Sequence, residues 1–271
     1  MCLKKSIAIL FFLYSTIFVS AQNFIFLNSY PLKEEAKWAV DGLGNIIISE
    51  KDRLYKVTID GKILFDQSQK SIGRIDEIGY VNSLKLFGFS EQQQLICFFD
   101  NSLSSLEKCI DLSDYDFMNV SLVTSSIQSD KLWVFDQVNS TLQLVSLKGL
   151  LQSQLIKNLN GILNSEQLVQ MIEWDNRLYL VDKGRGIYCL DNFGTLIKFY
   201  EQKEVTKIQV YNDYLICLTG DSFTFHSMNK ETPPFSFALP IENVLDFYVS
   251  EDHVYLRGTD AINRFLIEFS K

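Results

Sequence analysis

The stretch SLVTSSIQSDKLWVFDQVNSTLQLVSLKGLLQSQLIKN, residues 121–158, decides the fold. It contains four short apolar segments, and polar turns separate most of them. In the second segment, KLWVFD, Leu132 and Val134 point to one side of a strand while Trp133 and Phe135 point to the other. Both faces of this strand are therefore apolar and must be covered. The stacked sheets of a β-propeller supply such cover, because each blade packs between its two neighbours.

A strand pair of this kind recurs six times along the chain. The spacing of equivalent positions is roughly 36 to 52 residues, close to the period of about 40 to 45 residues expected for four-stranded propeller blades. The sequence predicts an all-β fold, a six-bladed β-propeller with four-stranded antiparallel blades; five blades would result if residues 23–84 were extra structure. The equivalent positions are Leu54, Leu106, Leu142, Ile187, Phe223 and Ile262.

The two ends of the repeat predict how the ring closes. The last unit stops shortly after RFLIEF and lacks a fourth strand, whereas a surplus strand, NFIFLNS at residues 23–29, precedes the first unit. We expect this surplus strand to pair with the final blade, because closure removes the free sheet edges of an open array.

Blade 2 and two long connections are assigned from weaker patterns. LKLFGFS is expected as the innermost strand of this blade, QLICFFD as its second strand and SLEKCIDL as its third. Residues 67–83 are then an insertion. A second insertion, residues 150–170, is expected to hold one helical turn around SEQLVQM.

Residues 1–21 have the pattern of a signal peptide. Lys4 and Lys5 precede an apolar run, and Val19-Ser20-Ala21 offers small residues before a cleavage point at Gln22. The apolar run is shorter than the about 20 residues of a spanning helix, and Gln22 is not the cysteine of a lipoprotein. We expect residues 22–271 to form a single propeller domain that is exported to the periplasm or secreted, with no lipid anchor and no membrane span after cleavage.

The mature chain is acidic. Loss of the two lysines takes the formal charge from −8 to −10, since residues 1–21 carry no acid. A protein of this charge without a basic run is a poor partner for nucleic acid or anionic lipid.

Four cysteines remain in the mature chain, each inside an apolar strand: Cys97, Cys109, Cys189 and Cys217. Their spacing differs from that of metal sites. Cys97 and Cys109 lie on two arms of one expected hairpin and form the best candidate pair for a disulfide. The interpretation we favour for all four is a buried free thiol.

The first unit, DGLGNIIISEKDRLYKVTIDGK at residues 41–62, resembles the NHL repeat. The matching residues are Asp41, Gly44, Asn45, Arg53, Asp60 and Gly61. The resemblance implies a six-bladed propeller of the broad group that includes NHL, TolB-like and lactonase-like propellers. It implies no single function, because this group mixes binding modules, scaffolds and a few enzymes.

An acidic residue recurs at the expected turn between the second and third strands of each unit. These six carboxylates would lie on one rim of the disc, as a cation or polyol site or as simple caps of tight turns. Turn caps are the interpretation we favour, and the rim is the tentative binding face. Its members are Asp52, Asp100, Asp136, Asp182, Asp221 and Asp260.

No residue pattern indicates a catalytic, cofactor or metal site. His226 and His253 have no acid at ligand or triad spacing, and Ser90 and Ser222 lack the flanking glycines of a nucleophile elbow. Lactonase-like propellers hold a metal in the central channel, which leaves a divalent cation as the one cofactor to consider. The acids near the expected innermost strands do not share one register: Asp41, Glu173, Asp175, Asp213 and Asp246.

Two functions follow as hypotheses. The first is a non-catalytic binding or scaffold protein of the bacterial periplasm or envelope that holds a protein or envelope polymer on one propeller face. Aromatic residues near turns, Tyr30, Tyr115 and Phe117, are candidate partner contacts. The alternative is a metal-dependent, lactonase-like hydrolase with carboxylates around the central channel.

Overall fold

The four apolar segments of residues 121–158 form one antiparallel sheet, β10 to β13, in the order of the chain. Its second strand is covered on both sides, as its sequence requires. Trp133 and Phe135 pack in one core cluster with Leu178 of the next blade, while Val134 packs in another with Phe87 of the preceding blade. The alternation of side chains along one strand therefore fixes the stacking of three blades.

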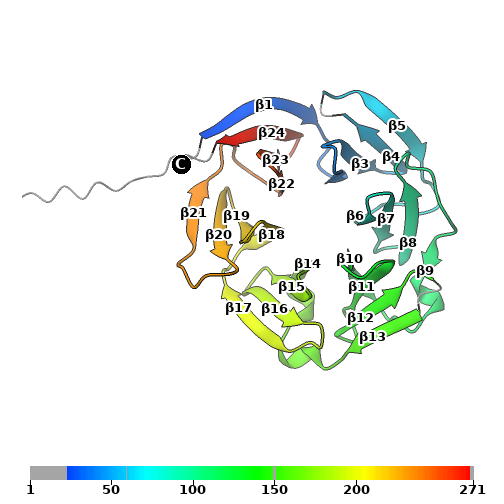
Figure 1. Cartoon of the computed structure of the whole chain (residues 1–271). Helices are drawn as coiled ribbons and strands as arrows, with labels where there is room; N and C mark the ends of the chain where they lie inside the picture. Colours follow the sequence, from blue (N-terminus) through cyan, green and yellow to red (C-terminus); the bar gives the residue numbers. More distant parts are fainter. Residues whose placement is uncertain (1–22, 59, 149–150, 269–271) are drawn as a thin grey trace, which may run out of the picture.

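The computed structural model describes residues 23–268, apart from residues 59 and 149–150, and shows six four-stranded antiparallel sheets around a central axis (Figure 1). The all-β six-bladed propeller is confirmed. Blade 1 is β2 (Lys37–Val40), β3 (Ile46–Glu50), β4 (Arg53–Val57) and β5 (Ile63–Ser68); blade 2 is β6 (Glu77–Asn82), β7 (Lys85–Ser90), β8 (Leu95–Asp100) and β9 (Ile110–Asp111); blade 3 is β10 (Val120–Ser125), β11 (Lys131–Asp136), β12 (Thr141–Ser146) and β13 (Leu151–Ile156). Blade 4 is β14 (Leu168–Trp174), β15 (Arg177–Asp182), β16 (Gly186–Asp191) and β17 (Leu196–Glu201); blade 5 is β18 (Val205–Tyr211), β19 (Tyr214–Thr219), β20 (Ser222–Ser227) and β21 (Phe235–Ala238); blade 6 is β22 (Asp246–Ser250), β23 (His253–Arg257), β24 (Ala261–Glu268) and β1 (Asn23–Pro31).

Strand β1 closes the ring, as the sequence predicts. It is the outermost strand of blade 6 and runs antiparallel to β24 (Figure 1). Phe24 of β1 places its ring 6.1 Å from that of Phe265 in β24 and 5.8 Å from that of Phe237 in blade 5. The first and last parts of the described chain thus share one sheet, and this blade has no strand missing.

Blade 2 corrects the assignment made from sequence. Its innermost strand is β6, which the pattern placed in an insertion, so LKLFGFS is the second strand and QLICFFD the third. In SLEKCIDL only Ile110 and Asp111 form a strand. The signal of β6 is weak because Glu77, Gly79 and Asn82 interrupt its apolar residues.

The expected helical turn in the connection to blade 4 is present as a short 3-10 helix, η3 (Ser165–Gln167). Two further 3-10 turns are η1 (Leu112–Asp114) and η2 (Leu159–Gly161). All three lie in connections between blades.

A disulfide joins Cys97 of β8 to Cys109, the residue before β9. The favoured interpretation of free thiols is therefore wrong for this pair, because the short outer strand returns beside β8 and brings the two side chains together. Cys189 and Cys217 are free and buried, as expected.

Glutamine side chains on inner strands join neighbouring blades. Gln209 of β18 donates from Nε2 to the Val249 carbonyl at 2.7 Å, and its Oε1 accepts the Val249 N–H at 2.7 Å. Gln170 of β14 makes the same pair of bonds with Ile208. Each amide substitutes for a backbone partner between two sheets, so blade spacing is set by hydrogen bonds as well as by apolar packing.

Replacing Gln209 tests this role. We expect Gln209→Ala to lower the free energy of unfolding by about 1 to 3 kcal/mol, because it leaves a backbone N–H and a carbonyl of β22 without partners. Gln143→Ala is the matched control, since the Gln143 side chain has no hydrogen-bond partner among the described residues. Urea unfolding measures both variants; equal midpoints would contradict the role.

The antiparallel order gives the disc two different faces. On the proximal face the innermost strands β2, β6, β10, β14, β18 and β22 begin, and second strands turn into third strands there. On the distal face the innermost strands end, and third strands turn into fourth strands. These two names are used below.

Candidate functional site

Five of the six candidate rim aspartates lie on the proximal face. Asp52, Asp136, Asp182, Asp221 and Asp260 each stand at the turn between a second and a third strand or at the end of the strand before it.

Asp100 is the exception and corrects the prediction. It ends the third strand β8 and lies on the distal face, because β6 shifts the strand count of blade 2 by one. Its carboxylate accepts the N–H and the hydroxyl of Ser102 at 2.8 and 2.7 Å and the N–H of Ser104 at 3.0 Å. These bonds hold the pKa of Asp100 below its usual value, although slight burial opposes them.

The two fully buried rim aspartates accept hydrogen bonds from backbone N–H groups. Asp136 is fully buried and accepts the N–H groups of Met118 at 2.8 Å and Asn119 at 3.3 Å. Asp182 is also fully buried and accepts the N–H of Gly184 at 2.9 Å. Asp182 thus caps its own turn, the role favoured from sequence. Asp136 caps its own turn through the Asn139 N–H at 3.2 Å, while its bonds to Met118 and Asn119 hold the segment before β10.

The carboxylates near the innermost strands are divided between the two ends of the channel. Asp41, Asp175 and Asp213 follow the ends of inner strands on the distal side, whereas Asp246 begins β22 on the proximal side. Within the part of the chain that the structure describes, no three His, Cys, Asp or Glu residues come together as a metal-ligand group.

A hollow of about 550 Å³ opens on the distal face between blades 1 and 2. Four large apolar side chains line it and remain exposed: Leu43 at 89 %, Leu84 at 71 %, and Leu64 and Phe65 at 39 % each. We call these four residues the distal apolar patch. Asn45, Lys56, Asp100, Asn101 and Ser102 form the polar part of the lining.

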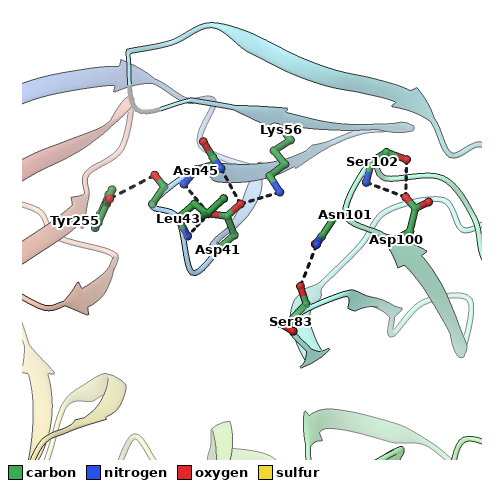
Figure 2. A network of polar contacts seen from close by, with 10 residues as sticks. Asp41, Leu43, Asn45, Lys56, Ser83, Asp100, Asn101, Ser102 and Tyr255 are labelled. Carbon is green, nitrogen blue, oxygen red and sulfur yellow. Dashed lines mark hydrogen bonds and ion pairs between the residues drawn. The ribbon is translucent and has the colours of Figure 1, made fainter.

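The turn that carries Leu43 is held by one buried carboxylate (Figure 2). Asp41 accepts the N–H groups of Leu43 and Asn45, both at 2.8 Å, and the Nδ2 of Asn45 at 2.8 Å. Lys56 of β4 approaches Asp41 at 2.7 Å. Gly44 takes a φ of +79°, and a Cβ there would lie 3.0 Å from the Tyr255 hydroxyl, so glycine is strongly favoured at this position. These contacts give Asp41, Gly44 and Asn45 a structural role in this turn.

The electrostatics of this turn favour an ionised Asp41. Burial would raise the pKa of Asp41, but Lys56, Asn45 and the backbone N–H of Leu43 donate to the carboxylate and hold its pKa below the usual value. Both side chains of the ion pair are 7 % exposed. Leu43 therefore projects from a rigid base.

The second turn of the hollow is held in a similar way. The Leu84 N–H donates to Asn82 Oδ1 at 2.9 Å. Asn101 Nδ2 donates to the Ser83 carbonyl at 3.0 Å (Figure 2). The two most exposed apolar side chains of the patch thus stand on turns whose backbone is fixed by side-chain hydrogen bonds.

The partner contacts expected from sequence differ from this patch. Tyr115 is 37 % exposed, whereas Phe117 and Tyr30 are half-buried and pack against core clusters. Leu43 and Leu84 were missed because a single leucine in a turn has no periodicity. The signal that could have found them is a large apolar residue inside a glycine- or serine-containing turn, as in DGLGN and NSLK.

No family model matches this sequence, and no curated protein matches it. Solved structures are similar: virginiamycin B lyase from Staphylococcus aureus (TM-score 0.60, 13% identity, 89% of this chain and 87% of that one), a streptogramin B lyase (0.58, 13%, 85% and 78%) and BBS1N in complex with ARL6DN (0.58, 10%, 84% and 76%). At these identities the similarity shows the propeller fold alone. The described residues contain no helix that is both long and apolar enough to cross a membrane.

Proposed function

We propose that this protein is an exported, non-catalytic binding protein of the bacterial envelope, and that the distal apolar patch holds a protein partner. The observation that carries the proposal is the exposure of Leu43 and Leu84 beside Leu64 and Phe65 around one hollow. Exposed apolar side chains that gather at one place mark interaction sites, because their hydration is unfavourable until a partner covers them.

Rigidity of the turns supports the same conclusion. Ordering a loop on binding costs free energy, and a patch whose backbone is already fixed avoids most of that cost. Asp41 and Lys56 fix one turn, and Asn82 and Asn101 fix the other. These contacts keep leucines exposed that a flexible turn would fold back onto the protein.

Charge favours a protein partner with polar or basic residues around an apolar centre. The hollow is bordered by Asp100, Asn101 and Ser102, and the mature chain is acidic overall. Among similar folds, BBS1N was solved in complex with ARL6DN, so a propeller of this size can hold a protein; the two lyases show that the fold also supports catalysis.

Export rests on the signal-like pattern of residues 1–21, which lie outside the described residues. The disulfide Cys97–Cys109 is consistent with an oxidising compartment, where such bonds persist. We place the protein in the periplasm or outside the cell, without a lipid anchor.

Affinity capture from intact envelopes tests the proposal. Leu84→Asp should reduce recovery of the partner about tenfold or more, because burying a leucine contributes about 1.5 to 3 kcal/mol and a buried charge adds a further penalty. Val138→Asp is the matched control, since Val138 is 62 % exposed on the proximal face. Recovery of the bait alone, or of the same proteins with both variants, would contradict the assigned site.

A further inference from the structure

The proximal mouth of the central channel holds a second cavity, of about 560 Å³. It lies between the beginnings of the innermost strands, on the face opposite the distal apolar patch. A cavity of this size is within the range of small-molecule sites. Its lining carries both signs of charge. Glu77, Glu91 and Arg74 lie at blade 2, Lys207 belongs to blade 5, and Asp246 and Arg257 belong to blade 6.

The acidic wall has unused acceptors. No described residue donates a hydrogen bond to the Glu77 carboxylate or forms an ion pair with it. Burial raises the pKa of Glu77; the Lys207 ammonium opposes this shift, and the Asp246 carboxylate adds to it. Burial and the neighbouring Asp76 raise the pKa of Glu91 as well. A cationic group that entered the cavity would give the Glu77 carboxylate the direct partner that it lacks among the described residues.

The basic wall has unused donors. The Asp246 carboxylate already has two hydrogen-bond donors, Trp38 Nε1 at 3.0 Å and the Phe247 N–H at 2.8 Å. Lys207 forms an ion pair with Asp246 at 3.5 Å, which leaves two of the three donors of its ammonium group for a ligand. Arg257 is 7 % exposed; it donates to the Glu34 carbonyl, but its Nε has no partner within the described chain.

The remaining lining is mostly polar, with a smaller apolar part that can contact the hydrocarbon body of a ligand. Ile78, Leu122 and Leu245 contribute hydrocarbon surface. The hydroxyls of Ser121 and Thr206, two residues of the lining, are buried and lack a hydrogen-bond partner in the described residues.

Glu77 and Lys207 act on each other electrostatically but form no ion pair with each other among the described contacts. A molecule that carries both charges close together would satisfy both groups at once. We propose that this cavity binds a small zwitterion with a hydrocarbon body, with its ammonium group on Glu77 and its carboxylate on Lys207. A free aliphatic amino acid, or the two ends of a short aliphatic peptide, has this chemistry.

Calorimetric titration of the folded protein tests the inference. L-leucine and the dipeptide Leu-Leu are the two zwitterionic probes, and they distinguish a free amino acid from a short peptide. 4-Methylpentanoate lacks the ammonium group and 3-methylbutylamine lacks the carboxylate. We expect saturable binding of at least one zwitterion, with each analogue of leucine weaker by about tenfold or more, which corresponds to the loss of one charged contact.

Variants assign the two contacts. Glu77→Gln should abolish the preference for leucine over 4-methylpentanoate, and Lys207→Met should abolish the preference over 3-methylbutylamine. Leu84→Asp, on the other face, should bind the zwitterion unchanged, so failure of this site and failure of the distal site are distinguishable. Absence of saturable binding for both zwitterions, or equal affinity for the analogues, would overturn the inference. If a variant does not fold, the comparison of leucine with its two analogues on the unaltered protein still tests whether both charges are recognised.

Discussion

Deleting residues 23–31 should lower the free energy of unfolding by about 5 kcal/mol or more, an amount comparable to the net stability of an ordinary domain. Strand β1 supplies the outer strand of blade 6 and pairs along β24 from Asn23 to Pro31. Its loss removes the packing of Phe24 on Phe265 and Phe237. Burial of one such aromatic side chain contributes about 1.5 to 3 kcal/mol, and the strand hydrogen bonds add to this.

The control for this deletion is a chain that begins at Asn23. Urea unfolding followed by circular dichroism gives the midpoints of both. A synthetic peptide of residues 23–31, added in excess, should restore stability to the truncated chain by pairing with the exposed edge of β24. Equal midpoints for the two chains would show that β1 does not close the ring in a way that matters for stability.

Lys56→Met should cost about 3 to 5 kcal/mol at pH 7, because it leaves the Asp41 carboxylate buried without its cation. The double variant Asp41→Asn with Lys56→Met should recover much of this loss, since no uncompensated charge remains. The single variant Lys56→Met should also weaken partner binding, because Asp41 holds the turn that carries Leu43.

The contribution of Asp41 to stability should depend on pH in opposite directions with and without Lys56. In the unaltered protein the pKa of Asp41 lies below its ordinary value of 3.8, so its contribution to stability is full above that pH and is lost as the pH falls through the lowered pKa. Without Lys56, burial dominates and raises this pKa, so the carboxylate destabilises the fold at pH 7 and is relieved by protonation in acid.

Chemical unfolding at pH 7 and pH 4 measures this difference. The gap in stability between the unaltered protein and Lys56→Met should shrink by about half or more at pH 4. Lys62→Met, on the same blade but exposed, serves as the control and should show no such narrowing. A gap that stays constant between the two pH values would mean that Asp41 does not depend on Lys56.

Much of the fold follows from the sequence because two-sided apolar strands such as KLWVFD need cover on both faces, and stacked sheets at the period of the repeat supply it. The closing strand was also predictable. Residues 23–29 form an apolar segment that precedes the first repeat unit and is surplus to its four strands. Strand β6 was not, because Glu77 faces the channel and Gly79 contributes no apolar side chain. That one error also placed Asp100 on the wrong face.

The candidate sites were harder to predict because exposure depends on tertiary structure. Leu43 and Glu77 are single residues without a local pattern, and only the arrangement of the blades shows that one is uncovered and the other unpaired. The rim aspartates had a pattern, and in Asp136 and Asp182 the carboxylate accepts a backbone N–H of its own turn.

Site-specific photo-crosslinking in living cells tests whether the distal apolar patch binds a protein partner. A photoreactive amino acid replaces Leu84 in the distal apolar patch in one strain and Val138 on the proximal face in another. We expect position 84 to yield a discrete adduct with one envelope protein after irradiation, and position 138 to yield none. Irradiated cells in which position 84 gives no protein adduct, or the same adducts as position 138, would contradict a partner-binding role for the distal hollow.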